Sequence, residues 1–154
     1  MNAMQPKHPP ELNPGRPVPT WSSSLSVGNA KLDEQHITLL ELGRDLMRLL
    51  DTETATQVQI HAALEDIVKQ SQLHDAREEK ILEVNGCPTL DEHKAAHQTS
   101  RAELATLLSD VSRGAEDRAV LSRWVVDWMG HHISENDLPV KDYLRQTPKA
   151  RTTD

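Results

Sequence analysis

The sequence predicts an all-α protein, an up-down-up-down antiparallel four-helix bundle with an extended proline-rich N-terminal arm and a short C-terminal helix. Four long segments after residue 30 carry apolar residues at the three- and four-residue spacing of amphipathic helices. The connections between these segments are short, and short connections make consecutive helices antiparallel neighbours. The composition agrees: 36% of the residues are hydrophobic, 3% are aromatic and Phe is absent, which suits helix packing better than a β-sandwich.

The predicted arm is the opening stretch MNAMQPKHPPELNPGRPVPTW. Six of the nine prolines lie in it, which indicates an extended, partly polyproline II segment without a packed structure of its own. A chain of 154 residues has the usual size of one domain. We therefore expect a flexible arm over residues 1–20, one bundle over residues 21–146 and a flexible tail over residues 147–154.

The first two helices are predicted over residues 31–50 and 56–84. One face of the first contains His36, Leu39, Leu40, Met47 and Leu50. Gly43 interrupts this face and marks either close packing or a tolerated weak point, because a mid-helix Gly costs about 1 kcal/mol relative to Ala. The matching face of the second helix contains Ile60, Leu64, Ile67, Ser71, His74, Glu78 and Ile81. In the sequence NGCP that follows, Gly86 suits a C-terminal cap and Pro88 suits the opening of the next helix.

The third and fourth helices are predicted over residues 89–112 and 116–137. The face of the third contains Leu90, His93, His97, Leu104, Leu108 and Val111. The face of the fourth contains Leu121, Val125, Trp128 and His132. Pro139 disfavours helix at Leu138, so we expect the chain to break there before a short final segment that runs through Tyr143.

The bulk properties exclude several classes of partner. A net charge of −7 without a basic stripe argues against nucleic acid and against an anionic membrane surface. No apolar run approaches the ~18 residues of a transmembrane helix, and the N-terminus lacks the apolar centre of a signal peptide. The single Cys87 cannot form an intramolecular disulfide and fits a reducing compartment. We expect a cytoplasmic monomer in which Cys87 is a small semi-buried residue.

Each of the four apolar faces contains histidine, and this coincidence indicates a metal centre. A single histidine on such a face is usually a core residue with a hydrogen-bond partner. Five buried imidazoles and a carboxylate without partners, however, would cost several kcal/mol each, more than a small domain tolerates. A shared metal centre removes this cost because the polar atoms become ligands.

The spacing and chemistry of these residues favour two irons. His74 with Glu78, and His93 with His97, stand at i,i+4, so each pair projects toward one point. Imidazole and carboxylate without thiolate suit iron, and fit zinc or copper less specifically. With one further acid from the stretch HHISEND, five histidines and two carboxylates are too many ligands for one metal. If both carboxylates bridge two irons and a solvent oxygen joins them, one iron is six-coordinate and the other keeps an open position for a small diatomic molecule.

Other candidate ligands have simpler interpretations. His61 and Glu65 also stand at i,i+4 but lie beside the apolar stripe, which indicates a solvated ion pair. His8 lies in the arm, and Glu79 points about 100° away from Glu78, so it is either solvated or next to a ligand. A carboxylate-rich, ferritin-like site requires Glu-x-x-His pairs on two helices. None of the eight histidines has a Glu three residues before it, which argues against that architecture.

In this order the motifs resemble those of the hemerythrin family, specifically its stand-alone bacterial members. Trp21, the Val-Gly pair at residues 27–28 and LDEQH at residues 32–36 are similar to the family's opening. HDAREE at residues 74–79 is similar to its His-x-x-x-Glu motif, HKAAH at residues 93–97 to its His-x-x-x-His motif, and HISEND at residues 132–137 to its His-x-x-x-x-Asp motif. The resemblance covers residues 20–145, and seven ligand positions in order make it specific.

The resemblance implies a ligand set and a function. His93, His97 and His132 would hold one iron, His36 and His74 the other, and Glu78 and Asp137 would bridge them beside an oxo or hydroxo group. It implies reversible O2 binding at the five-coordinate iron by an oxygen carrier or supply protein that is not an enzyme and that delivers O2 to an unknown protein recipient. The chain departs from the family pattern by having Asp75, where Phe usually follows the ligand, and Leu39–Leu40 near the first ligand. The dry pocket would then consist of Leu, Ile, Val and Trp128.

Two other functional classes remain open from the sequence. The first is an O2 or redox sensor that changes a contact with a partner, although the arm is the only extra element in which an output could lie. The second is enzymatic, with peroxidase-like or nitric-oxide-reducing activity, or iron handling. Reversibility of O2 binding distinguishes the carrier from both.

The stretch HHISEND raises one further expectation. The only i,i+4 pair in it is His131 with Glu135, but His132 shares the apolar face, and the interval to Asp137 is that of the family. Residues five apart on a regular α-helix point ~140° away from each other. We therefore expect the fourth helix to be distorted, for example by a π-bulge, or to end between Ser134 and Asp137.

Overall fold

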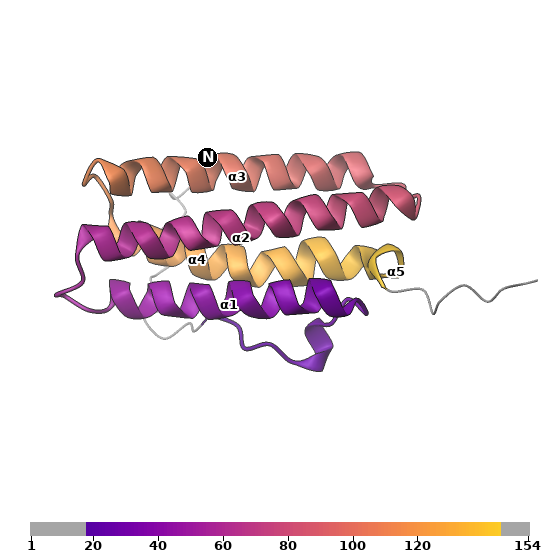
Figure 1. Ribbon diagram of the computed structural model, residues 1–154, viewed down its shortest axis with the longest axis horizontal. Helices are drawn as coiled ribbons and strands as arrows, with labels where there is room; N and C mark the ends of the chain where they lie inside the picture. Colours follow the sequence, from indigo (N-terminus) through magenta and orange to yellow (C-terminus); the bar gives the residue numbers. More distant parts are fainter. Residues whose placement is uncertain (1–17, 146–154) are drawn as a thin grey trace, which may run out of the picture.

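The computed structural model describes residues 18–145, and within them it is a bundle of four long helices (Figure 1). These are α1 (Ala30–Leu50), α2 (Gln57–Val84), α3 (Leu90–Ser112) and α4 (Arg118–His131). Successive helices run in opposite directions, with α1 packed against α2 and α4, and α2 packed against α3. The predicted fold class is confirmed. Residues 1–17 of the predicted arm, with His8, and the predicted tail lie outside the described residues.

Short elements flank the four long helices. A 3₁₀ turn, Ser23–Leu25, precedes α1. After α4 the chain continues as a π-helical segment, His132–Asp137, then a 3₁₀ turn, Leu138–Val140, and finally α5 (Lys141–Leu144). The side chain of Asn29 caps α1 and also donates a hydrogen bond to the carbonyl of Leu144, so the start of the bundle is tied to its end. The predicted short C-terminal helix is confirmed.

The helix boundaries follow from local sequence signals. Thr56 and Gln59 form a capping box at the start of α2, and the Asp117 carboxylate accepts the first amides of α4. Gly86 ends α2 with a φ of +67°, a left-handed conformation that Gly adopts without steric cost. Because α4 begins at Arg118, its N-terminus lies two residues after the predicted position.

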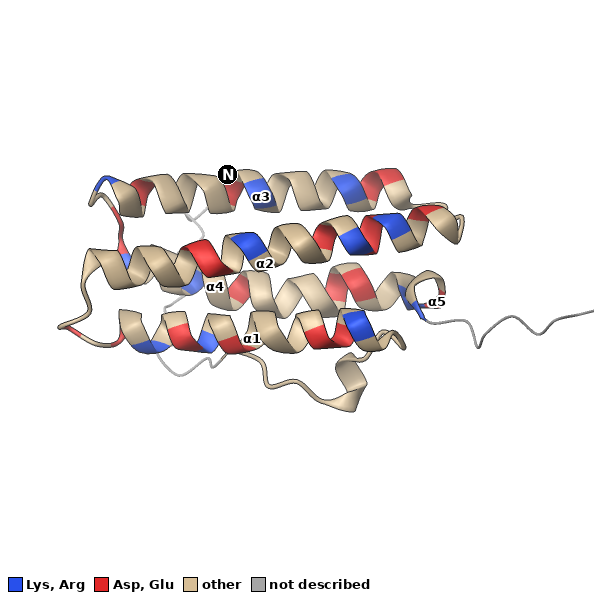
Figure 2. Ribbon diagram, viewed as in Figure 1, with Lys and Arg blue, Asp and Glu red and all other residues tan. Residues whose placement is uncertain are grey.

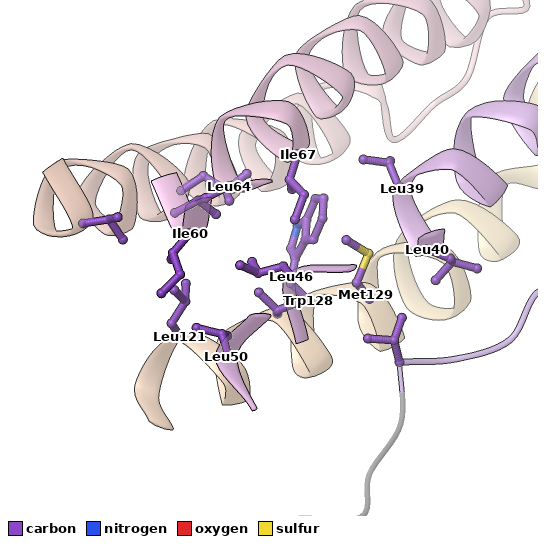
Figure 3. Close-up of a cluster of buried hydrophobic side chains, with 14 of the residues drawn as sticks. Leu39, Leu40, Leu46, Leu50, Ile60, Leu64, Ile67, Leu121, Trp128 and Met129 are labelled. Atoms are coloured by element: carbon purple, nitrogen blue, oxygen red, sulfur yellow. The ribbon is translucent and has the colours of Figure 1, made fainter. Parts of the chain in front are cut away.

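The apolar core consists of two clusters. The larger one contains leucine, isoleucine and valine from α1, α2, α3 and α4, together with Trp128 and Met129 (Figure 3). The smaller cluster contains Val27, Leu32, Leu82, Cys87 and Leu144, and it seals the end of the bundle where α5 lies. Burial of these side chains, at about 25 cal/mol per Å² of apolar surface, is the main term that favours the fold.

The predicted core face of α1 is correct except at one residue. Leu46 is fully buried, whereas the predicted Met47 lies at the edge of the core. Gly43 marks close packing, since a Cβ atom there would lie 3.1 Å from the Cε atom of Met129 on α4.

The outer surfaces of the bundle are charged. Figure 2 shows acidic and basic positions interspersed along all four long helices, with the acidic residues in excess in the sequence. Within residues 18–145, no helix combines the length and the apolar character that crossing a membrane requires.

Candidate metal centre

A layer of buried polar residues separates the two apolar clusters. Along α2, the larger cluster ends near Ile67, the polar layer follows at His74 and Glu78, and the smaller cluster begins at Leu82. The layer contains all seven residues that the sequence singles out, each at most 6% exposed: His36, His74, Glu78, His93, His97, His132 and Asp137. They lie on α1, α2, α3 and the π-helical segment after α4, so helices rather than loops hold the layer.

The Nε2 atoms of the histidines converge on the two carboxylates. His36 Nε2 lies 2.7 Å from Asp137 Oδ2 and 3.1 Å from His74 Nε2. On the other side of the layer, His93 Nε2 contacts Glu78 Oε1, and His97 Nε2 lies 3.3 Å from the same oxygen. His132 Nε2 lies 3.4 Å from Asp137 Oδ2. Imidazoles from four different segments of the chain therefore converge on two carboxylates.

Three overlapping groups of possible ligand atoms arise, in each of which the atoms lie within 4.8 Å of one another. They are His36, His74, Glu78, His132 and Asp137; Glu78, His93, His97 and Asp137; and Asp75, His97 and His132. The first two groups contain all seven predicted ligands and share Glu78 and Asp137. Among the described residues, no group contains both His93 and His132.

Local backbone geometry brings Asp137 into this layer. Residues His132–Asp137 form a π-helix, in which the Leu138 amide donates to the carbonyl of Ile133, five residues earlier. Hydrogen bonding at i→i+5 widens each turn, so residues five apart face the same side, as they do not in an α-helix. The predicted distortion is confirmed, although it begins at His132, two residues before the expected position. Pro139 follows directly, within the next 3₁₀ turn.

The neighbouring acid and histidine point to solvent. His131 Nδ1 lies 2.7 Å from Glu135 Oε2, and the two side chains are 61% and 64% exposed. His61 and Glu65 form a similar partly exposed pair at 3.6 Å. Neither pair approaches the buried layer, as the sequence predicts.

The outer ring nitrogens of two histidines are also fixed. His74 Nδ1 lies 3.0 Å from Gln35 Oε1, and His97 Nδ1 lies 3.1 Å from Glu79 Oε1. An Nδ1 proton donated to these oxygens leaves the lone pair of each ring on Nε2, which faces the carboxylates. Such orienting partners are typical of metal-binding histidines.

Strong electrostatic coupling perturbs the titration of these groups. Burial alone would lower the pKa of His74 and of His93, but Asp137 and Glu78 raise both to about 10. Burial would raise the pKa of Glu78, yet the histidines hold it at about 2. Burial lowers the pKa of His132 to about 4. Protons therefore occupy positions that a cation could take, and a cation that binds must displace them.

Comparison of the sequence with known protein families identifies the family of the chain. The family described as the Hemerythrin HHE cation binding domain matches residues 27–144. The chain belongs to the hemerythrin family.

Individual hemerythrin relatives are distant but cover most of the chain. A bacteriohemerythrin of Ralstonia nicotianae (strain ATCC BAA-1114 / GMI1000) is 28% identical and covers 88% of this chain and 96% of its own length. A bacteriohemerythrin of Stenotrophomonas maltophilia (strain R551-3) is 24% identical and covers 81% of this chain and 80% of its own length. A crystal structure of wild-type hemerythrin superposes with a TM-score of 0.76 at 23% identity, over 84% of this chain and 99% of that one. The last comparison shows a shared fold.

The polar layer has the properties of a cation site. Within residues 18–145, several buried atoms of the layer have no hydrogen-bond partner, among them His97 Nε2, His132 Nε2 and Asp137 Oδ1. Buried polar atoms without partners are costly, and ligation to a metal removes that cost. A donor set of imidazole nitrogen and carboxylate oxygen suits the iron of a hemerythrin centre. The residues present therefore fit a di-iron cofactor.

Sequence reasoning missed two residues of the layer's surroundings. Gln35 orients His74 through its side-chain oxygen. In the sequence it stood out only as part of the motif LDEQH, and no role of its own was expected. Asp75 is 2% exposed, and burial raises the pKa of its carboxyl to about 6. Asp75 lies off the apolar face of α2. The one feature of the sequence that drew attention to it was that it stands where hemerythrins usually have Phe. For Glu79, the sequence left two alternatives, and the structure places it next to a predicted ligand.

Proposed function

We propose that this hemerythrin binds two non-haem irons, joined by an oxo or hydroxo bridge, and binds O2 reversibly as an oxygen carrier or supply protein. The observation that carries the proposal is the convergence of five buried imidazoles on two buried carboxylates. The proposed ligands are His36, His74, Glu78, His93, His97, His132 and Asp137.

The geometry of the two carboxylates supports a bridging role. Oε1 of Glu78 faces His93 and His97, while its Oε2 lies 2.9 Å from His74 Nε2. Asp137 divides its oxygens in the same way, with Oδ2 at 2.7 Å from His36 Nε2 and Oδ1 at 3.5 Å from His93 Nε2. Each carboxylate thus presents one oxygen to each half of the layer. This supports a division into a half with His93 and His97 and a half with His36 and His74. His132 lies between the halves, since its Nε2 atom is 3.4 Å from the Asp137 oxygen that faces His36, while His132 also groups with His97 and Asp75; its assignment to the half with His93 and His97 is the one that the resemblance implies.

The surroundings of the layer support reversible binding rather than substrate oxidation. Two iron(II) ions would supply the two electrons that O2 binding takes up. The chain's own contribution is a dry site, because Trp128, Met129 and Ile133 are buried beside His132 and the two apolar clusters close both ends of the layer. Exclusion of water limits proton leakage and loss of the bound ligand.

The proposed partners rest on the acidic composition of the chain. We propose that it acts as a cytoplasmic monomer without nucleic acid or membrane partners and delivers O2 to a protein recipient. Its functional unit comprises residues 21–146, with the arm dispensable for O2 binding.

The proposal is tested by loading the full chain with iron under anaerobic conditions and exposing it to air. A carrier develops a visible charge-transfer band in air and loses it under vacuum, over repeated cycles. If air gives only a permanently oxidised form, the carrier role is wrong, and sensing or enzymatic turnover becomes the better explanation. Deletion of residues 1–20 further distinguishes a carrier from a sensor that signals through the arm. A carrier without its arm is expected to bind O2 with unchanged affinity.

A further inference from the structure

A third buried carboxylate faces the metal-binding layer. Asp75 follows the predicted ligand His74 on α2, and its side chain is 3% exposed. Its Oδ1 atom lies 3.4 Å from His97 Nε2 and, among the described residues, has no hydrogen-bond partner. The Nε2 atom of His97 also forms no hydrogen bond, although Glu78 Oε1 lies 3.3 Å away on the other side; Glu79 hydrogen-bonds to the other ring nitrogen, Nδ1. Two buried polar atoms thus point at the same space and do not satisfy each other.

The second oxygen of Asp75 faces the opposite way. Oδ2 lies 3.8 Å from Nη1 of Arg101, whose side chain is 34% exposed on α3. At this distance Arg101 partly balances the charge of the carboxylate without a close hydrogen bond. The ion pair therefore orients Asp75 and leaves Oδ1 free on the inner side.

The ligand geometry of this group matches that of a cation site. One atom each of Asp75, His97 and His132 lie within 4.8 Å of one another, and all three residues are buried. A carboxylate oxygen beside two imidazole nitrogens is a donor set for a first-row divalent metal. Leaving the Asp75 oxygen without a partner would cost free energy that ligation recovers.

We propose that Asp75 is a further metal ligand, which binds the metal held by His97 and His132 through Oδ1. The inference rests on the proposed two-metal centre and deepens it. The centre then contains three carboxylates rather than two, and the added negative charge strengthens binding of the cation at that half. Arg101 is a positioning residue that holds the other oxygen of Asp75.

Cobalt(II) serves as the probe, because its visible spectrum reports its ligands and its binding needs no O2. Anaerobic titration of the metal-free full chain is expected to give two cobalt ions per chain. Asp75→Asn keeps the side-chain shape and removes a buried charge, so the variant is expected to keep its helical circular dichroism. We expect the variant to bind one of the two cobalt ions with an affinity lower by about tenfold or more. The visible absorption of that ion should also change.

Two matched variants sharpen the result. Asp66→Asn makes the same change at an exposed position of α2 and is expected to leave affinity and spectrum unchanged. Arg101→Gln removes the partner of Asp75 but keeps the carboxylate, and is expected to keep the spectrum of the original chain.

Three outcomes overturn the inference. The first is an unchanged cobalt spectrum in Asp75→Asn, with or without a change in affinity. The second is an Arg101→Gln spectrum altered in the same way as that of Asp75→Asn. The third is a wild-type chain that fails to take up two cobalt ions, which contradicts the proposed two-metal centre itself and is thereby distinguished from the other two.

Discussion

Asp137 Oδ2 lies 2.7 Å from His36 Nε2, although the two residues are 101 positions apart in the chain. The contact joins the first long helix to the π-helical segment that follows the last one. Both side chains are fully buried. A centre assembled in this way needs the whole bundle, so metal binding and folding are expected to be coupled.

The two adjacent histidines of α4 and the π-helix provide the first prediction. His132→Ala removes a buried ring of the layer and is expected to lose iron. His131→Ala removes an exposed ring and is expected to keep it. Iron content after gel filtration measures both, and the reverse result would mean that the assignment of His132 is wrong.

The second prediction concerns the residues that orient ligands from outside. Glu79→Leu removes the oxygen at His97 Nδ1, and Gln35→Leu removes the oxygen at His74 Nδ1. Loss of such partners typically lowers metal affinity about 10- to 100-fold. Competition with a chromophoric chelator measures the affinity. Glu83→Leu, at an exposed position of α2, is the control and should bind metal normally.

The third prediction is the pH dependence of the metal-free protein. The pKa values of His74 and His93 are raised from 6.5 to about 10 by Glu78 and Asp137, against the effect of burial. Their protonation therefore stabilises the fold fully below pH 6.5, and this contribution is lost as the pH rises through 10. Urea denaturation of the metal-free chain should show a falling free energy of unfolding between pH 7 and 10.

The metal-loaded protein is the control for that titration. Its imidazoles are ligands without the extra protons, so its stability should not fall in the same alkaline range. A metal-free chain whose stability is constant or rises from pH 7 to 10 would contradict the assigned charge coupling.

The fourth prediction concerns the aromatic wall of the site. The ring of Trp128 lies 5.3 Å from that of His132 and stacks on Trp124 at 5.4 Å. Trp128→Ala should lower the free energy of unfolding by about 3–5 kcal/mol and speed the oxidation of the iron-loaded protein in air, because water enters the cavity. Trp124→Ala, at the less buried end of the stack, should change the oxidation rate less. Equal rates in both variants would mean that Trp128 does not shield the site.

The sequence was sufficient for the fold and for the residues that converge. Helical spacing places His36, His74, His93 and His132 on core faces, and the structure buries all four. The helix distortion was predictable once the resemblance to hemerythrins paired His132 with Asp137, because an interval of five residues does not fit a regular α-helix.

Other features required the three-dimensional structure. The burial of Leu46 rather than Met47 depends on how α1 is rotated against its neighbours, and both residues fit the same apolar pattern. Asp75 lies off the apolar stripe of its own helix and is buried by its neighbours on α3, such as His97 and Arg101. Contacts of this kind depend on the packing of two helices, which the spacing of residues along one helix does not specify.

The iron content of the chain is the most direct test of the central claim. The full chain is loaded with iron(II) under anaerobic conditions, freed of excess metal and analysed for iron against protein concentration, beside a variant that carries Glu78→Gln and Asp137→Asn. We predict about two irons per chain for the original protein and a large loss for the variant. Clearly fewer than two irons in the original chain, or an unchanged content in the variant, would contradict the proposed centre.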